Sequence, residues 1–329
     1  MLSNFAYVQP QSLKAALKQL ETPEARLHAG GTDLLGCLRE GIFGAKKIVS
    51  ISGLNAFKGV RETSNGGLRI GALTTITQVE RHPAIRSRFR ALSQGAGEVA
   101  SPQLRNQGTI GGNICQKPRC WYYRGEFHCL RKGGERCYAV GGENQYHCIF
   151  GGENCFIVHP SDTAPPLVAL EAVVRIVGPQ GTRSVPVSRF HVPPSEDFRQ
   201  ETVLAPDEMV TEIILPPAPS GLRSSYRKVR ARRAWDFSLA GMALAITFKD
   251  NTVQKARVVF SGVAPVPWRS KEVEVAITGR RLDKETVARA ADAAVREAEP
   301  MEKNGYKISL LRGVVEEELL AAQSGESPG

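Results

Sequence analysis

The sequence lacks several features that would place it in a large, well-defined class of proteins. No apolar run approaches the ~20 residues that a membrane-spanning helix needs. No CxxC pair occurs, which disfavours a zinc finger or a thioredoxin-type redox pair. There is also no HExxH motif and no convincing Ser/His/Asp set, so the chain lacks the residues of a complete hydrolase. Any chemistry is therefore expected to reside in bound cofactors, for which the protein supplies position and electrostatics.

The opening residues, MLSNFAYVQPQSL, have neither the basic start nor the apolar run of a secretory signal. We therefore expect no secretory leader on this chain, and its sequence does not indicate an oxidising compartment. The final residues, SGESPG, are expected to be disordered.

The composition is that of an ordinary globular protein, with 42% hydrophobic and 23% charged residues. A chain of 329 residues can bury a substantial core, and we expect two or three units. The formal net charge of +10 permits binding to nucleic acid, to an anionic cofactor or to an acidic partner. The basic run at 227–233 has no RNP-like pattern and no recognition helix, so nucleic-acid binding is disfavoured.

What the sequence does have is a concentration of cysteine. Six of the seven cysteines lie between Cys115 and Cys155, in a stretch that is otherwise Gly-rich, polar and irregular. Gaps of eight, seven and seventeen residues separate four of them, namely Cys120, Cys129, Cys137 and Cys155. Long gaps suit a loop that wraps around a group larger than one ion. We therefore predict that these four thiolates hold a [4Fe–4S] cluster.

Two alternatives for this stretch stay open. The cysteines could form disulfides, or they could hold a structural zinc ion. His128 and His147 are possible substitutes in the set of four ligands. Cys115 follows what we interpret as a strand turn in GGNIC, and Cys148 lies in the apolar string HCIFGG. Both are interpreted as packing residues.

The first unit is expected over residues 1–53. Apolar residues repeat at helical spacing from Leu13 to Leu20 after Ser12, a plausible N-cap. A strand is expected over 26–29, a helix over 34–38 and a second strand over 47–51. This order predicts a compact βαβ-like unit.

The second unit is expected over 54–218, with the cysteine-rich insertion at about 114–157. GLRIGAL (67–73) indicates a strand, and TTITQVERHP (74–83) a helix opened by Thr74 or Thr75. SRFRALSQGAGEVA (87–100) indicates another helix. HPSDTAPPLVALEAVVRIVG (159–178) indicates a helix and a strand, so the insertion interrupts a fold that continues on both sides of it. Pro-rich LPPAPSG (215–221) is typical of a linker.

The third unit is expected over 219–329. Strands are predicted in SSYRKVR (224–230), ALAITFKD (243–250), TVQKARVVFSGV (252–263) and VEVAITG (273–279). Two helices close the unit. Apolar residues between Val287 and Ala298 form one face of the first helix, with Asp283 as its cap.

Two glycine turns have the character of anion-binding loops. AGGTDL (29–34) leads from a strand into a Gly pair and a helix start, and TIGGN (109–113) is a second glycine turn of this kind. Small residues let the backbone approach an anion, whose oxygens successive N–H groups can bind. AGGTDL is neither a GxGxxG fingerprint nor a phosphate loop, and two ordinary turns are an equally good interpretation.

Four segments together carry a resemblance to a known family. AGGTDL, ASPQLRNQGTIGGN, HPSDTAPPLVALEA and YRKVRARRAWDFSLAG resemble, in this order, the FAD-binding subunit of the xanthine oxidase family of molybdenum hydroxylases. The resemblance covers essentially the whole chain. Most members pass almost directly from the GGN turn to the SD segment, whereas about forty residues intervene here. This insertion, with CWYYRGEFHCLRKGGERCYAV, is similar to the [4Fe–4S]-binding insertion of periplasmic aldehyde oxidoreductase flavoprotein subunits.

The resemblance implies an α+β fold: an FAD-binding fold of the vanillyl-alcohol-oxidase/PCMH type, built from two α/β subdomains, and a C-terminal domain like that of CO dehydrogenase flavoproteins. Within it, the FAD pyrophosphate would be wrapped by Leu27, His28, Ala29, Gly30, Gly31, Thr32, Asp33 and Leu34. A second phosphate-side contact would come from Thr109, Gly111, Gly112 and Asn113. Asp162 would bind the ribose or adenine side, Leu204 would lie near the flavin ring, and Lys228 would approach the pyrimidine edge of the flavin. Without the resemblance, Asp162 is a helix cap, Leu204 a core residue and Lys228 part of a solvated basic face.

The resemblance also implies an oxidoreductase subunit with no catalytic residue of its own. A large partner with a molybdenum cofactor would hydroxylate an aldehyde or N-heterocycle. A small [2Fe–2S] partner would pass electrons to FAD here, for an external acceptor. A hydroxybenzoyl-CoA reductase-like flavoprotein subunit and a self-contained flavin oxidoreductase with a zinc-stapled loop are the alternatives. The expected location is the cytoplasm, or the periplasm through export with a signal-bearing partner.

Overall fold

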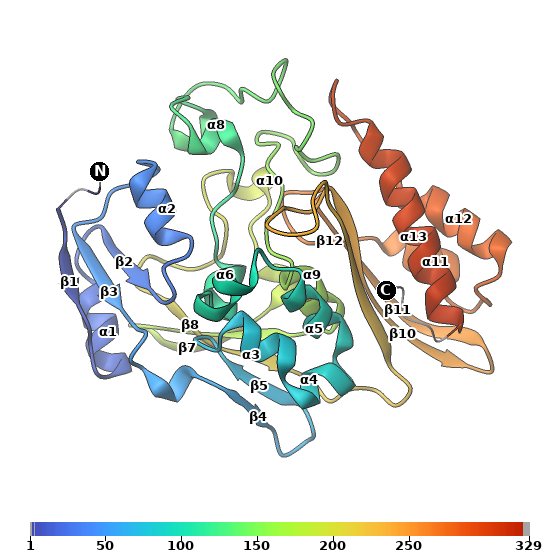
Figure 1. Ribbon diagram of the computed structural model, residues 1–329, viewed down its shortest axis with the longest axis horizontal. Coiled ribbons are helices and arrows are strands. Elements are labelled where there is room, and N and C mark those ends of the chain that lie inside the picture. Colours follow the sequence, from blue (N-terminus) through green and yellow to red (C-terminus); the bar gives the residue numbers. More distant parts are fainter. Residues whose placement is uncertain (1, 3, 325–329) are drawn as a thin grey trace.

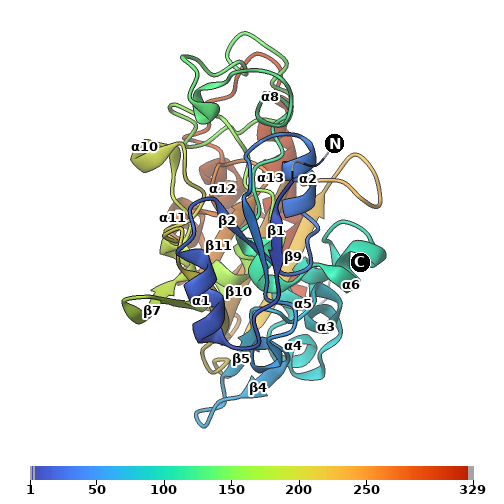
Figure 2. The same ribbon diagram turned by 90° about the vertical axis from the view of Figure 1, so that its left-hand side faces the viewer.

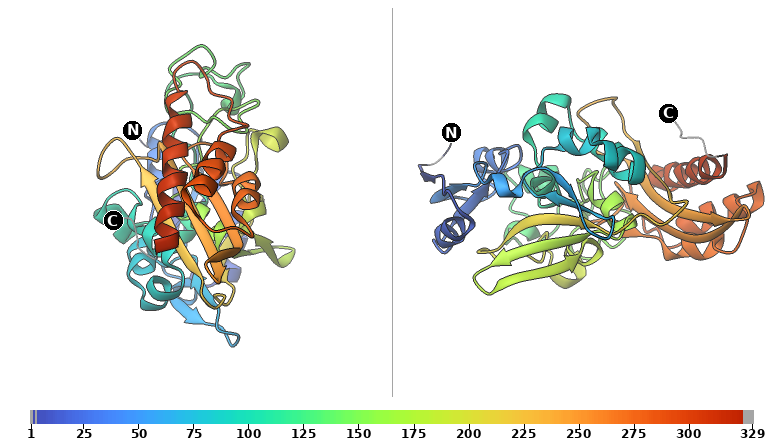
Figure 3. Two further views of the ribbon diagram at one scale, coloured as in Figure 1. Left: turned by 90° about the vertical axis from the view of Figure 1, so that its right-hand side faces the viewer. Right: turned by 90° about the horizontal axis from the view of Figure 1, so that it is seen from below.

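The computed structural model describes residues 2 and 4–324. The end of the chain (325–329), for which disorder is expected, lies outside the described residues. Three sheets with their helices lie in a row, as the view from below in Figure 3 shows, and the cysteine-rich segment forms a cap at the top of Figure 1. None of the helices among the described residues combines the length and the apolar character needed to cross a bilayer.

The first unit is a small parallel sheet with two helices (Figure 2). Its strands β1 (Ala6–Val8), β2 (Ala25–His28) and β3 (Lys47–Ser50) pair in the order β1-β3-β2. Helix α1 (Leu13–Leu20) begins where the Ser12 side chain accepts a hydrogen bond from the Ala15 amide, and α2 (Leu34–Arg39) follows the glycine loop. The predicted elements are confirmed; β1 was not predicted, because its side chains are mostly exposed and carry no periodic signal.

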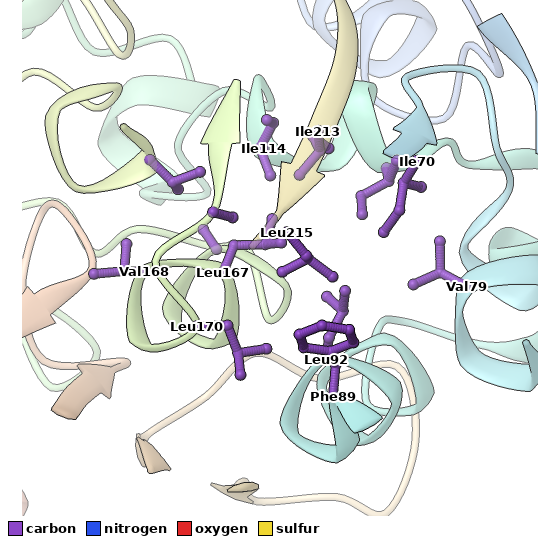
Figure 4. Close-up of a cluster of buried hydrophobic side chains, with 14 of the residues drawn as sticks. Ile70, Val79, Phe89, Leu92, Ile114, Leu167, Val168, Leu170, Ile213 and Leu215 are labelled. Carbon is purple, nitrogen blue, oxygen red and sulfur yellow. The ribbon is translucent and has the colours of Figure 1, made fainter. Parts of the chain in front are cut away.

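The second unit is a five-stranded antiparallel sheet in the order β4-β5-β8-β6-β7. Its strands are β4 (Val60–Glu62), β5 (Leu68–Gly71), β6 (Val173–Gly178), β7 (Gly181–Pro186) and β8 (Met209–Leu215). Its helices are α3 (Ile76–Arg81), α4 (Pro83–Arg88), α5 (Arg90–Gly97), α6 (Pro102–Gln107), α7 (Ile110–Ile114), α9 (Ala164–Ala169) and α10 (Pro194–Asp197), with 3-10 turns η1 (Asn55–Phe57) and η3 (Val187–Arg189). Figure 4 shows the core of this unit, where Phe89, between α4 and α5, and Leu92 of α5 lie near Leu215 of β8.

The third unit is a four-stranded antiparallel sheet in the order β12-β11-β10-β9. Its strands are β9 (Arg223–Val229), β10 (Ala240–Lys249), β11 (Thr252–Ser261) and β12 (Trp268–Arg269). Helices α11 (Lys271–Ile277), α12 (Lys284–Ala294) and α13 (Tyr306–Ser324) cover one face, as the left view of Figure 3 shows. Helix α9 packs against β10 and β11, and α5 packs against β9, so the second and third units share an extensive contact.

The cysteine-rich insertion is almost without regular structure. It contains only α8 (Trp121–Arg124) and the 3-10 turn η2 (Leu130–Lys132). Contacts with the third unit hold it in place. The Asn304 amide donates to the carbonyls of His147 and Cys148, and the Lys307 ammonium donates to those of Tyr146 and Gly262. The insertion is therefore ordered by side chains far along the chain, which local sequence patterns cannot reveal.

Three secondary-structure predictions were wrong, and a fourth was wrong only about where the helix ends. VEVAITG is helix α11, because the Ser270 side chain caps it and the buried Val273 and Ile277 follow helical spacing. TIGGN is not a turn but the start of α7, and Cys115 is the C-terminal cap of that helix rather than a residue after a strand turn. SRFRALSQGAGEVA is divided at Phe89 into α4 and α5. The helix capped by Asp283 is confirmed, but it ends at Ala294.

Candidate functional site

Two cavities adjoin each other where the first and second units meet. One has a volume of about 240 Å³, the other about 390 Å³, and Thr32, Asp33, Thr109, Gly112 and Gln116 line both. The first cavity is also lined by Leu27, Ala29, Gly30, Gly31, Leu34, Gly111 and Leu204, and the second by Asn113 and Asp162. The structure thus gathers nearly all of the predicted cofactor-binding residues around one continuous region. Of the predicted set, only His28 and Lys228 line neither cavity.

The two glycine segments differ in the backbone donors that they offer. In the described part of the chain, the amides of residues 30–34 donate no hydrogen bond, and no side chain caps α2. The amides of Ile110 and Gly111 instead donate to the carbonyls of Thr74 and Ala72, and that of Gly112 donates to Thr109 Oγ1. Only the first segment therefore has main-chain donors ready for an anion. Thr109 retains its hydroxyl hydrogen as a donor.

Three glycines in these segments have different roles. A Cβ built on Gly30 would lie 2.0 Å from the Gln107 carbonyl oxygen, so this loop touches the segment before Thr109 through a glycine. Gly31 has a φ of +73°, a conformation that favours glycine. Gly112 differs from both. A Cβ there would meet only Thr109 Oγ1, at 3.1 Å, so its bare face is turned to the cavities that it lines.

Asp33 connects the glycine loop to the cysteine-rich insertion. Its carboxylate accepts a hydrogen bond from Arg124 (2.8 Å) and one from the Lys117 amide (2.7 Å), and it pairs with Arg119 at 3.0 Å. These cations hold the pKa of Asp33 below its usual value despite burial. Because Arg119 and Arg124 flank Cys120, the carboxylate fixes the start of the insertion against the loop. This contact was not predicted, since it spans more than eighty residues of sequence.

Asp162 and Lys228 form a buried ion pair beside the second cavity. The Lys228 ammonium is 2.8 Å from Asp162 Oδ2 and also donates to the carbonyl of Glu98, while the Tyr226 hydroxyl donates to Asp162 Oδ1. Burial raises the pKa of Asp162, and the ion pair opposes that shift. Asp162 does not cap α9, because the Ser161 hydroxyl accepts from the Ala164 amide instead. Lys228 therefore does not line the cavity itself but is ion-paired with Asp162, which does.

Several cavity residues were missed by the sequence analysis. The first cavity has an apolar wall to which Phe43, Leu73, Met209 and Val210 contribute along with Leu204. Trp235 and Phe237 line the second cavity, on the loop after β9. Residues in a loop with no helical or strand spacing carry no pattern that assigns them to a site. Trp235 is 67% exposed in the structure, and the only sequence signal for Trp235 and Phe237 is that they lie in the segment YRKVRARRAWDFSLAG.

The four predicted cysteines line a single small cavity in the insertion. Cys120, Cys129, Cys137 and Cys155 come from separate segments and surround about 10 Å³ of free space, together with Tyr122, Arg131 and His147. All seven cysteines are free thiols, which removes the disulfide alternative. Among residues 2 and 4–324, no group of three or more Cys, His, Asp or Glu side chains is arranged to hold a metal ion. The thiols thus converge without forming a compact single-ion site.

Burial favours the thiol over the thiolate at two of these cysteines, Cys120 and Cys155. Burial raises the pKa of Cys120 to about 12, and burial also raises that of Cys155. Arg131 opposes the shift at Cys155 through its charge and a hydrogen bond. Its side chain is 2% exposed and is held by Glu201 and by the carbonyls of Phe198 and Gln200. A metal centre would supply the positive charge that four thiolates in this place need.

Of the remaining cysteines and of the two histidines considered as ligands, only His147 lines the thiol cavity. Cys115 lines the first large cavity, and neither Cys148 nor Cys37 lines the thiol cavity. His147 lies 3.2 Å from Cys120 Sγ through Nε2, whereas His128 is outside the lining. The interpretation of Cys148 as a packing residue agrees with its 1% exposure.

Comparison with known proteins gives two family matches. Residues 3–218 match the FAD binding domain in molybdopterin dehydrogenase, and residues 224–322 match the CO dehydrogenase flavoprotein C-terminal domain. The chain is 34% identical to the FAD-binding subunit of an aldehyde oxidoreductase from Escherichia coli K12, over 94% of this chain and 95% of that subunit. It is 28% identical to the carbon monoxide dehydrogenase medium chain of Hydrogenophaga pseudoflava, over 97% and 96% of the two chains.

Solved structures agree with the sequence matches. Carbon monoxide dehydrogenase from Hydrogenophaga pseudoflava superposes with a TM-score of 0.79 at 26% identity, covering 99% of this chain and 100% of that chain. Quinoline 2-oxidoreductase from Pseudomonas putida 86 superposes with a TM-score of 0.78 at 20% identity, over 99% of both chains, and supports the fold alone. The expected two-part fold is confirmed by these matches.

Proposed function

Because the chain belongs to the family of FAD-binding subunits of molybdenum-cofactor hydroxylases and dehydrogenases, we propose that it is the electron-transfer subunit of an aldehyde-oxidising complex. Substrate is oxidised at a molybdenum cofactor on a large partner, and [2Fe–2S] centres on a small partner deliver the electrons to this chain. The choice of aldehyde is supported by the name of the 34% identical relative. Electrons leave this subunit for an external acceptor.

FAD fits the two adjoining cavities. The residues common to both cavities lie between an apolar wall containing Leu204 and a polar wall containing Asp162, so an elongated dinucleotide would have its phosphates near the middle. There the unused amides of residues 30–34 and the Thr109 hydroxyl would bind the pyrophosphate. Leu204 and Asp162 would contact opposite ends of the cofactor. Bound FAD supplies the ability to exchange one or two electrons.

A [4Fe–4S] cluster is the second cofactor that we propose, held by Cys120, Cys129, Cys137 and Cys155. The donor set supports this: four thiols face one small space, and no disulfide competes for them. The four cysteines lie in irregular segments, outside the helices and strands. A single zinc ion is less well supported, since no compact group of three ligands occurs in the described residues. The chemistry supplied by the cluster is one-electron transfer.

The observation that carries the proposal is that consecutive residues line the two candidate cofactor sites. Arg119 lines the larger FAD cavity, and the next residue, Cys120, lines the thiol cavity. Arg119 also forms an ion pair with Asp33 of the glycine loop. Co-purification tests the function. Two partner subunits should co-purify with the tagged chain. The complex should oxidise aldehydes with ferricyanide as the electron acceptor, and this chain alone should not. Aldehyde turnover by the isolated polypeptide would contradict a subunit role and support a self-contained flavin enzyme.

Arg131 gives a prediction about the cluster itself. Replacing it with methionine should make the cluster potential more negative, because a buried positive charge that favours the reduced, more negative state is removed. A unit charge several ångströms away at an effective dielectric of about 20 predicts a shift on the order of 50–100 mV. A redox titration followed by electron paramagnetic resonance measures it. Arg136→Met is the control, since Arg136 is exposed and lies over the Tyr138 ring. Equal shifts in the two variants would show that Arg131 does not set the potential.

A further inference from the structure

A third cavity, of about 470 Å³, lies between the two candidate cofactor sites. It is bounded by the start of the insertion, by the segment after Cys155 and by the loop between β9 and β10. Its lining is Arg119, Cys120, Trp121, Tyr146, His147, Val158, His159, Pro160, Ala231, Arg232, Asp236, Phe237, Ser238 and Leu239. None of the residues predicted to bind FAD is among them.

The lining has the chemistry of a site for a planar aromatic molecule. The walls are largely apolar, and the aromatic rings Trp121, Tyr146 and Phe237 are 39%, 51% and 45% exposed. Trp121 and Tyr146 meet edge to face, with ring centroids 5.6 Å apart. Solvent-exposed aromatic rings around a hollow of this volume are characteristic of ligand sites rather than of a folded core.

A few polar groups accompany the rings. His159 Nε2 is a buried nitrogen with no hydrogen-bond partner among the described residues, and the His159 ring lies against His191 with centroids 4.2 Å apart. Burial lowers the pKa of His159 well below its usual value, so the ring is neutral and can donate or accept one hydrogen bond. The guanidinium of Arg119 lies over the Phe237 ring at 5.4 Å. Such groups are suited to a ligand that carries carbonyl oxygens on an aromatic frame.

The cavity also has a wall in common with each cofactor site. Cys120 and His147 line both this cavity and the thiol cavity. Arg119, Pro160, Asp236 and Phe237 line both this cavity and the larger FAD cavity. A molecule bound here would therefore be separated from either site by a single layer of residues. This position distinguishes the cavity from the polar groove around Arg81 and Arg86, which has no wall in common with the thiols.

We propose that this third cavity binds the electron acceptor of the complex, and that the acceptor is a quinone. The proposal rests on the proposed function, because the two electrons come from the reduced cofactors of this subunit, which return to their oxidised forms. Those electrons and two protons, taken up at the solvent-facing side of the cavity, convert the two quinone carbonyls into the two hydroxyls of a hydroquinone. The aromatic rings of Trp121, Tyr146 and Phe237 hold the quinone ring.

The test uses menadione, a two-ring quinone, and the purified complex with its flavin content verified. Calorimetric titration of the oxidised complex measures binding without turnover. Tyr146→Ala removes an exposed wall, and Leu239→Trp fills the cavity; neither residue lines the FAD cavities or the thiol cavity. Each should weaken menadione binding and raise the KM for menadione at least about tenfold, the loss of roughly one good contact. Ferricyanide turnover should be unchanged, because a small hydrophilic acceptor needs no apolar cavity. Tyr7→Ala, which removes an exposed tyrosine on β1, is the control.

Each other outcome has a distinct meaning. Wild-type complex that turns over ferricyanide but neither binds nor reduces menadione would overturn the quinone assignment and leave the proposed function intact. Equal losses with menadione and ferricyanide would overturn the cavity as the acceptor site. Loss of partner subunits from the Tyr146 and Leu239 variants would show that the cavity is covered by a partner and would also overturn the proposal. Absence of flavin, or of turnover with any acceptor, would mean that the proposed function itself is wrong.

Discussion

Replacing Gly112 with valine is expected to abolish FAD binding while the polypeptide stays folded. Gly112 lines both FAD cavities, and a Cβ at this position meets only Thr109 Oγ1, so a larger side chain extends into the space that the two cavities have in common. An affinity loss of at least about 100-fold, or about 3 kcal/mol, is the expected size. Flavin absorbance per polypeptide after desalting measures the loss.

A glycine elsewhere in the chain supplies the control for this substitution. Gly313 lies within α13, and a Cβ there has no neighbour within 4 Å. Gly313→Val therefore makes the same substitution within a helix, with the same change in helix propensity, without blocking a cavity. Gly112→Val protein that keeps a full complement of FAD would contradict the placement of the cofactor. A variant that melts far below Gly313→Val would point to damage at α7 instead.

Replacing Cys129 with serine is expected to remove the iron of the insertion and leave FAD bound. Cys129 is 6% exposed and lines the thiol cavity, but neither FAD cavity contains it. A cluster that lacks one of its four thiolate ligands releases iron more easily, because the serine hydroxyl is a poor ligand for iron–sulfur centres. Iron and flavin assays on anaerobically purified wild-type and variant complexes measure the two cofactors separately.

Cys115→Ser is the matched comparison, since Cys115 lies in the same part of the chain but lines an FAD cavity. It should retain the iron that Cys129→Ser loses. If the Cys115 variant loses iron and the Cys129 variant keeps it, the ligand set is wrong. If both variants keep wild-type iron, the thiol cavity binds no iron at all.

Local patterns predicted much of the fold. Ser12, Thr75 and Asp283 are side-chain caps at the starts of α1, α3 and α12, because a cap is a short-range interaction that sequence displays directly. A strand was predicted for VEVAITG because its β-branched residues alternate over a short stretch. The segment is helix α11 instead, because Ser270 caps it and Val273 and Ile277 are buried on one face. Strand order within the sheets could not be predicted, since it depends on pairings between distant segments.

Most residues of the candidate sites were identified from the sequence, but the ion pairs and hydrogen bonds that join these residues to the rest of the protein were not. Cysteine spacing selected the four residues that line the thiol cavity, since crowded thiols are rare without a function. The tie from Asp33 to Arg119 and Arg124, the burial of Arg131, and the pairing of Lys228 with Asp162 all depend on contacts between distant segments. From the sequence, TIGGN was also predicted to bind an anion through its backbone amides, like AGGTDL. In the structure, however, the amides of Ile110, Gly111 and Gly112 already donate hydrogen bonds within the protein.

The most direct test of the account is the mass of this subunit with what it binds. Native mass spectrometry of the anaerobically purified complex, with subunits released in the instrument, distinguishes the candidate cofactors by mass. We predict a subunit mass equal to the polypeptide plus one FAD and one core of four iron and four sulfur atoms. A mass equal to the polypeptide alone, or to the polypeptide with FAD and a single zinc ion, would contradict a subunit that carries electrons through both a flavin and a cluster.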